Sequence, residues 1–144
     1  MKYSAEQEEQ LMTQLWSITI KDDPLNFVRY VFPWGQENTP LAEFEGPRKW
    51  QEKILRDIAT HIQRNQAIDL PEMYRLAVAS GRGIGKSALV AWIILFMLST
   101  RLGSTIIVTA NTEQQLKSRT WAELGKWLTL AINSHWFQNC SSEI

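Results

Sequence analysis

The sequence predicts an α/β fold in which helices precede the first strand. Three observations support this prediction. Residues 74–79 form a mostly apolar, strand-like run, a glycine-rich turn follows at 80–85, and the segment 88–98 is apolar throughout, as a buried core helix is. Residues 104–109 then form a second, β-branched run that is typical of a strand. A strand, a turn, a helix and a second strand in this order predict the opening part of an α/β domain.

The bulk composition describes one ordinary domain without a dominant charge. The chain has 144 residues, 44% of them apolar, and 15 basic residues balance 15 acidic ones. This balance gives no global signature of nucleic-acid binding, although a local basic patch remains compatible with it. The single cysteine, Cys140, excludes an intramolecular disulfide and fits a reducing compartment.

Neither a secretory signal nor a membrane span is expected. Residues 1–9 carry acidic and amide side chains where a signal peptide needs an apolar run. The longest apolar run, 88–98, is far shorter than the roughly 20 residues that a membrane helix needs. We therefore expect a cytoplasmic protein without a membrane partner.

The first part of the chain predicts three helices and a long loop. Residues 4–19 have an imperfect helical pattern, and a second helix begins at Pro24, where Asp23 is the expected cap. Residues 33–46 carry prolines and glycines and are expected to form a loop. Pro47 then opens a stronger helix that ends near residue 65, and its apolar side chains recur with the helical period.

One polar side chain interrupts the apolar face of the helix that follows Pro47. Gln51 shares that face with Leu55, Ile58 and Ile62. A buried amide needs hydrogen-bond partners. Two interpretations remain open at this point. The amide either caps a nearby backbone group or pairs with the edge of a base, since an amide offers both a donor and an acceptor, as adenine does.

The last part of the chain predicts one more helix. It follows the second strand and begins within residues 111–115, where Thr112 and Gln115 form a plausible capping box. Its apolar stripe consists of Leu116, Leu124, Trp127, Leu128 and Ala131. Polar connections at 66–72 and 99–103 separate the earlier elements.

Residues 80–87 read Ser-Gly-Arg-Gly-Ile-Gly-Lys-Ser and match a phosphate-binding loop, except that Ser80 replaces its first glycine. In such a loop, backbone N–H groups and the helix dipole bind a polyphosphate. Lys86 is expected to reach the β- and γ-phosphates, and the Ser87 hydroxyl to ligate Mg²⁺. A tight turn alone is the alternative, and the flanking elements disfavour it. The sequence thus predicts a P-loop NTPase core of the helicase/RecA-like class, with a nucleotide and Mg²⁺ as ligands.

Other reactive side chains do not predict a second site. His61 and His135 are isolated, without ligands at a spacing suited to a metal. No serine or cysteine nucleophile has a recognisable histidine partner. Arg48 and Lys49 either contact phosphate or DNA or form a solvated face, which is the commoner role of two basic residues at a helix start.

Four segments share the residues of one family, in the same order along the chain. They are Pro24 with Phe27 and 31–35 (Val-Phe-Pro-Trp-Gly), 47–51 (Pro-Arg-Lys-Trp-Gln), 79–87 (Ala-Ser-Gly-Arg-Gly-Ile-Gly-Lys-Ser) and 108–115 (Val-Thr-Ala-Asn-Thr-Glu-Gln-Gln). These segments resemble the large terminase subunit of tailed bacteriophages, the ATP-driven motor that packages DNA. The phosphate loop with Arg82 inside it is more specific than a generic loop of this kind.

The resemblance implies a role for each matching residue. Gln51 matches the glutamine that contacts adenine. Lys86 and Arg82 are the implied catalytic residues, because they match the phosphate lysine and a loop arginine near the γ-phosphate, and Ser87 matches the Mg²⁺-binding hydroxyl. The implied ATP contacts are Gln51, Ser80, Gly81, Arg82, Gly83, Ile84, Gly85, Lys86 and Ser87. The segment 111–115 resembles one that helicase-like motors place near DNA.

The resemblance also implies partners and a compartment. The family hydrolyses ATP to package viral double-stranded DNA into the procapsid, and its full-length members are also endonucleases. The implied partners are double-stranded DNA, the portal protein, the small terminase subunit and further copies of the same chain. The implied compartment is the cytoplasm of the bacterial host.

The chain departs from the family after the second predicted strand. The family continues to an apolar strand that ends in Asp-Glu, which holds Mg²⁺ and activates water, and then to a nuclease domain. The acids that remain here, Glu113, Glu123 and Glu143, do not end such a strand. We therefore expect an N-terminal helical segment at 1–46 and the first part of an ATPase domain at 47–144, which by itself is inactive or very slow.

Two alternative functions remain beside a terminase ATPase. A helicase-like or AAA-type ATPase shares the phosphate loop and a later strand–helix unit. A non-catalytic prophage remnant would hold nucleotide without turning it over. Sequence downstream of Ile144 separates the first alternative from a terminase, because an Asp-Glu strand followed by a metal-binding acidic cluster indicates a terminase. A turnover assay separates the second alternative.

Overall fold

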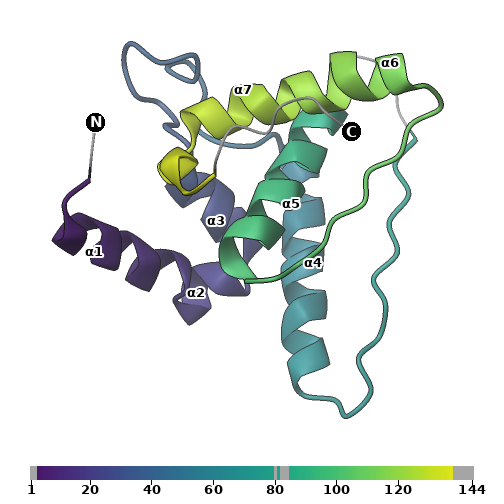
Figure 1. The fold of residues 1–144 in the computed structure, drawn as a ribbon. Helices are drawn as coiled ribbons and strands as arrows, with labels where there is room; N and C mark the ends of the chain where they lie inside the picture. Colours follow the sequence, from purple (N-terminus) through teal and green to yellow (C-terminus); the bar gives the residue numbers. More distant parts are fainter. Residues whose placement is uncertain (1–2, 80, 82–84, 138–144) are drawn as a thin grey trace.

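The fold is known from a computed structural model, which describes residues 3–79, 81 and 85–137. Within these ranges every regular element is a helix, and no strand or sheet forms (Figure 1). The predicted α/β class is therefore wrong for the described part of the chain. A P-loop NTPase core built around a sheet is wrong with it, although the helix that follows the glycine-rich turn is present.

The two segments predicted as strands are extended but unpaired. Residues 71–79 and 104–112 run along the right-hand side of Figure 1, outside the helices. Among the described residues, no backbone hydrogen bond joins 73–79 or 105–111 to a neighbouring segment. β-branched residues favour strands because they fit a pleated surface beside other strands, so the preference has no effect where that neighbour is missing.

The first predicted helix is divided in two. Helix α1 (Ala5–Leu15) begins with a capping box in which Ser4 Oγ accepts from the Gln7 N–H at 3.2 Å and Gln7 Oε1 accepts from the Ser4 N–H at 2.9 Å. A break at residues 16–17 precedes the short helix α2 (Ile18–Lys21). The imperfect apolar spacing of 4–19 reflects this break.

The start of helix α3 (Pro24–Val31) is confirmed. Asp23 Oδ1 accepts from the N–H groups of Leu25 and Asn26 at 3.0 and 3.2 Å, and Pro24 occupies the first helical position. The predicted loop at 33–46 is also confirmed, since it contains no helix or strand. It leads to the long helix α4 (Lys49–Gln66), two residues after the predicted start at Pro47.

Helix α5 (Lys86–Thr100) is the predicted core helix. It is apolar on every side and is covered on most of them, with Trp92, Leu95 and Phe96 fully buried. Val90 and Leu98 remain partly exposed, at 42% and 37%. The N-cap of α5 is Gly85, so the last residue of the predicted glycine-rich turn directly precedes the first turn of the helix.

The last long helix is continuous but irregular. It begins as α6 (Glu113–Gln115), passes through a π-helix at Leu116–Trp121 and ends as α7 (Ala122–Leu130). Thr112 Oγ1 accepts from the Gln115 N–H at 3.1 Å, as the sequence predicts for its cap. A short 3₁₀ turn, Ser134–Trp136, follows α7.

One apolar core joins all the longer helices. Phe27 of α3 meets Phe96 of α5 edge to face, with ring centroids 5.5 Å apart, and Trp127 of α7 meets Trp92 of α5 at 5.1 Å. In Figure 1, α7 lies across the N-terminal half of α5. Helices α3 and α4 lie on the other side of α5. Because this core includes residues from both sides of residue 46, the helices before 46 support the later ones directly. The division into two segments there stays a prediction.

Candidate functional site

A cavity of about 650 Å³ opens beside the N-terminus of α5. Three walls surround it. The loop before α4 contributes Trp34 and Phe44, the first turns of α4 and α5 contribute Gln51 and Lys86, and the last long helix contributes the third wall. The cavity therefore lies where the ends of several helices converge, and the predicted Gly85-Lys86-Ser87 triplet is part of its lining.

Gly85 has a backbone conformation that requires glycine. Its φ is +93°, in the left-handed region that side chains with a Cβ rarely adopt. A Cβ at this position would lie 2.5 Å from Gln51 Nε2, closer than any real contact allows. The close approach exists because Gln51 Nε2 donates to the Gly85 carbonyl at 2.9 Å.

The Gln51 amide joins the start of α4 to the residue that precedes α5. Its Oε1 accepts from the Arg48 N–H at 2.9 Å, while its Nε2 donates to Gly85 O. The side chain is almost fully buried, at 3% exposure. Of the two interpretations left open by the sequence, backbone capping is what the structure shows, and the contact with adenine stays a prediction.

The first turn of α5 faces the cavity without a side-chain cap. Gly85, the N-cap residue, has no side chain that could accept from the backbone N–H groups of this turn. Lys86 and Ser87 follow at the first two helical positions, and both line the cavity. Backbone N–H groups at a helix start and the positive end of the helix dipole make this turn a favourable place for an anion.

Positive charge dominates the cavity lining. Arg48, Lys86, Arg119 and Lys126 surround it, against a single carboxylate, Glu123. The Glu123 carboxylate already accepts from Trp127 Nε1 at 3.0 Å. Among the described residues, the lining is therefore built for an anion although the whole chain is electrically balanced.

Aromatic rings form the apolar side of the cavity. Trp34, Trp92 and Trp127 line it and pack against each other, with ring centroids 5.1 to 5.9 Å apart. Phe44, which is 53% exposed, stands at the same cavity on the loop before α4. Such rings offer flat surfaces on which a planar group can stack.

Several predicted site residues fall outside this description. Ser80, Arg82, Gly83 and Ile84 lie outside the described residues, so their roles stay predictions. Gly81 is described, and it is exposed. The segment 111–115 is mostly exposed and does not contribute to the cavity lining.

Sequence reasoning missed three polar residues of the site, Arg119, Glu123 and Lys126. Their spacing of four and three residues places them on one face of a helix, which was a usable signal. The apolar stripe of the same helix indicated only its opposite, buried side. Only packing of α7 against α5 brings this polar face beside Lys86.

The residues present fit Mg²⁺ only as a companion of phosphate. In the described part of the chain, no group of three or more histidine, cysteine or acidic residues could hold a metal by itself. Ser87 is exposed at the cavity, and its hydroxyl makes no hydrogen bond to another described residue. Mg²⁺ commonly binds one or two protein oxygens together with substrate phosphates, so one hydroxyl is compatible with such a site.

Comparison with protein-family models, with curated proteins and with solved structures gave no match to this chain. The sequence also predicted that no segment spans a membrane, and the described helices bear on that prediction. None of the described helices combines the length and the hydropathy that crossing a membrane requires.

Proposed function

We propose that this chain binds a nucleoside triphosphate together with Mg²⁺, and that the nucleotide is ATP. One observation carries the proposal: the Gly85-Lys86-Ser87 triplet opens a buried helix at the wall of a cavity with four cationic side chains and one carboxylate. The phosphates lie at the first turn of α5, where backbone N–H groups and Lys86 neutralise them. This arrangement does not depend on a sheet, because helix ends alone build the cavity.

The base occupies the aromatic side of the same cavity. Trp34 and Phe44 provide the stacking surface, and the cavity volume of about 650 Å³ is in the range of small-molecule sites. Gln51 stands between this side and the phosphate loop. Its amide contacts adenine through the hydrogen-bonding capacity that the Arg48 and Gly85 backbone groups leave.

Mg²⁺ enters with the nucleotide. The Ser87 hydroxyl is the protein oxygen that would hold it, and the ion supplies charge neutralisation between the β- and γ-phosphates. Lys86 acts on the same oxygens and stabilises the charge that develops on them during hydrolysis. Arg82 is proposed to assist at the γ-phosphate.

The biological role is the ATP-binding part of a phage or prophage large terminase. The four segments quoted above support this proposal by their resemblance to that family. The proposed partners are double-stranded DNA, the portal protein, the small terminase subunit and further copies of the chain. The proposed compartment is the host cytoplasm, and the endonuclease activity of the family belongs to the full-length protein.

A non-catalytic nucleotide-binding module is the second candidate. It is favoured by the Glu123 carboxylate, because the only acid in the described lining is already held by Trp127 Nε1 and is poorly placed to activate water. Phosphate release by highly purified chain distinguishes the two candidates. Turnover that depends on Lys86 supports the ATPase, and binding without turnover supports the module.

Calorimetric titration with Mg-ATP tests the binding proposal. The wild-type chain should bind saturably, and Lys86→Ala should lose at least about tenfold in affinity, because a charge-assisted contact to phosphate is removed. Lys53→Ala is the matched control, since Lys53 is an exposed lysine of α4 outside the cavity lining. Absence of saturable binding to the wild type, or equal binding by Lys86→Ala, overturns the proposal.

A further inference from the structure

The π-helix at Leu116–Trp121 contributes one side chain, Arg119, to the cavity lining. A π-helix contains more residues per turn than an α-helix. Such segments are rare in proteins overall, and those that exist often lie at functional sites. Arg119 lies inside this segment and lines the cavity, as Glu123 and Lys126 of α7 do. The irregular turn therefore carries a guanidinium to the wall that completes the cavity beside the first turn of α5.

Arg119 has no partner of its own in the described part of the chain. No ion pair or hydrogen bond engages its side chain there, and Glu123, four residues later, is instead bound to Trp127. Lys117 differs from Arg119, because Lys117 Nζ pairs with Glu113 Oε1 at 2.7 Å and Lys117 is not part of the cavity lining. An arginine presents five N–H donors in a planar fork that suits a phosphate.

A second polar group of the cavity also lacks a partner. Trp92 is 2% exposed and lines the cavity, and its Nε1 finds no hydrogen-bond acceptor among the described residues. Buried donors are nearly always paired, so an unpaired one marks a place where an acceptor is missing. Beside this buried donor, the cavity lining carries the Arg119 guanidinium and an excess of positive charge, and an oxyanion is the kind of ligand that suits both.

We infer that Arg119 is a phosphate-binding residue that contacts the polyphosphate of the bound nucleotide from the side opposite Lys86. This inference rests on the proposed nucleotide binding and extends it from the loop motif to the last long helix. Since Lys86 belongs to α5 and Arg119 to the helix packed across it, a polyphosphate between them holds the two helices together. Arg119 is then a binding residue that discriminates triphosphate from monophosphate.

The test is a comparison of affinities for Mg-ATP, AMP and inorganic tripolyphosphate. Arg119→Ala should weaken Mg-ATP and tripolyphosphate binding by about tenfold or more and AMP binding much less, because AMP lacks the outer phosphates. The affinity of Arg119→Lys for Mg-ATP should lie between those of the wild type and Arg119→Ala, since lysine keeps the charge but lacks the planar fork of N–H donors. Lys117→Ala is the matched control: it removes the same charge from the same turn and should change affinity by less than about twofold.

The outcomes separate this inference from the proposed function. If the wild type binds Mg-ATP, Lys86→Ala does not and Arg119→Ala still does, the inference is wrong and the nucleotide proposal stands. If the wild type binds tripolyphosphate with dependence on Arg119 but shows no preference for ATP, the anion site stands and the nucleotide proposal is wrong. Loss of binding in Lys117→Ala equal to that in Arg119→Ala reveals a general charge effect and overturns the inference.

Discussion

Gln51 Nε2 donates to the carbonyl of Gly85 at 2.9 Å, across 34 residues of sequence. This bond fixes Gly85, the N-cap residue of α5, against the first turns of α4. It also sets the position from which Lys86 and Ser87 enter the cavity, because both follow Gly85 directly. The loop geometry is therefore coupled to α4 through one buried amide.

Gly85→Ala should destabilise the chain and weaken nucleotide binding together. A side chain at φ +93° costs about 1–2 kcal/mol, and the contact of 2.5 Å with Gln51 Nε2 adds to this cost. We expect a loss of at least about 2 kcal/mol in the free energy of unfolding, measured by urea denaturation.

Gly125→Ala is the control for that change and should act in the opposite direction. Gly125 lies within α7 with open space around its Cα, and its φ is not positive. Alanine favours a helix over glycine by about 0.8–1 kcal/mol, so this variant should be slightly more stable. Equal losses in both variants would show that Gly85 has no special geometric role.

Gln51→Ala should reduce stability even without nucleotide. It removes the acceptor of the Arg48 N–H and a donor to Gly85 O from a nearly fully buried position. We expect a cost of about 1–3 kcal/mol in unfolding free energy. Competition between ATP and GTP then tests the adenine contact: a lost preference for ATP supports it, whereas equal losses for both nucleotides leave only the structural role.

Tyr74 should make the chain sensitive to alkaline pH. Burial, and then the negative charge of Asp57, raise the pKa of the Tyr74 phenol above its usual value. A raised pKa in the folded state favours the neutral phenol, so the stabilising contribution is complete below pH ~10 and is lost as the pH rises through the folded pKa.

The matched variant for this prediction is Tyr74→Phe, which cannot ionise. It should flatten the decline in thermal stability above pH ~10 while keeping the ring beside His61, whose centroid lies 5.1 Å away. A decline of unchanged steepness in Tyr74→Phe would assign the alkaline transition to other groups.

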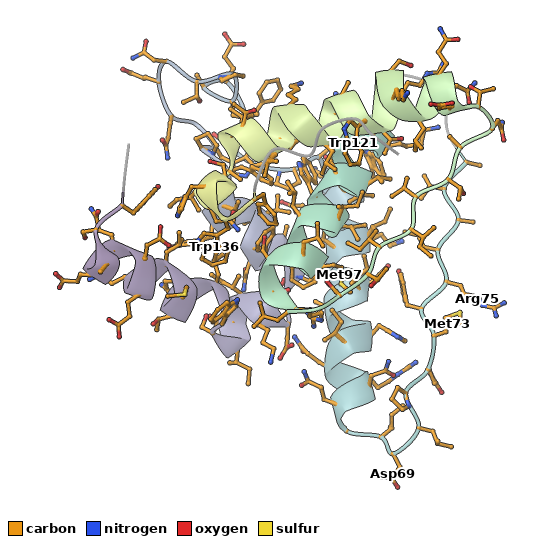
Figure 2. All side chains as sticks on the ribbon, in the orientation of Figure 1. Asp69, Met73, Arg75, Met97, Trp121 and Trp136 are labelled. Atoms are coloured by element: carbon orange, nitrogen blue, oxygen red, sulfur yellow. The ribbon has the colours of Figure 1, made fainter. Side chains whose placement is uncertain are left out.

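The unpaired extended segments should cause self-association. Ile107 and Leu102 are 84% and 82% exposed, and Figure 2 shows Met73 and Arg75 on the outer segment, pointing away from the helices. Unpaired backbone and exposed apolar side chains in extended segments favour association between chains. We expect concentration-dependent sedimentation that Ile107→Lys reduces.

Ile18→Lys provides the comparison for that variant. Ile18 is 77% exposed but belongs to helix α2, so it does not lie in an extended segment. It should leave the sedimentation behaviour nearly unchanged. A monodisperse wild-type monomer with a sharp thermal transition would contradict the prediction.

The sequence predicted the helices well and the strands wrongly, for one physical reason. The start of α3 is encoded by Asp23 and Pro24, whose cap bonds reach only two or three residues ahead. Residues 104–109 have an equally clear strand preference, yet a strand exists only where another segment pairs with its backbone. Such a partner is non-local, and the described part of the chain does not supply one.

The candidate site was predicted in part. The Gly85-Lys86-Ser87 triplet identified one wall of the cavity, because a local pattern encodes a turn followed by a helix start. Arg119 and Lys126 were not predicted as site residues, since nothing in their local sequence links them to Lys86.

The sequence by itself determined where helices begin, which helix is buried on most sides, and that a glycine-rich turn precedes the helix that starts at Lys86. These properties depend on contacts within a few residues or on hydropathy alone. The tertiary structure decided that 74–79 and 104–109 stay unpaired, that Gln51 binds Gly85, and that Arg119 meets the cavity. Each of these depends on groups far apart in sequence, which only the packing of α4, α5 and α7 brings together.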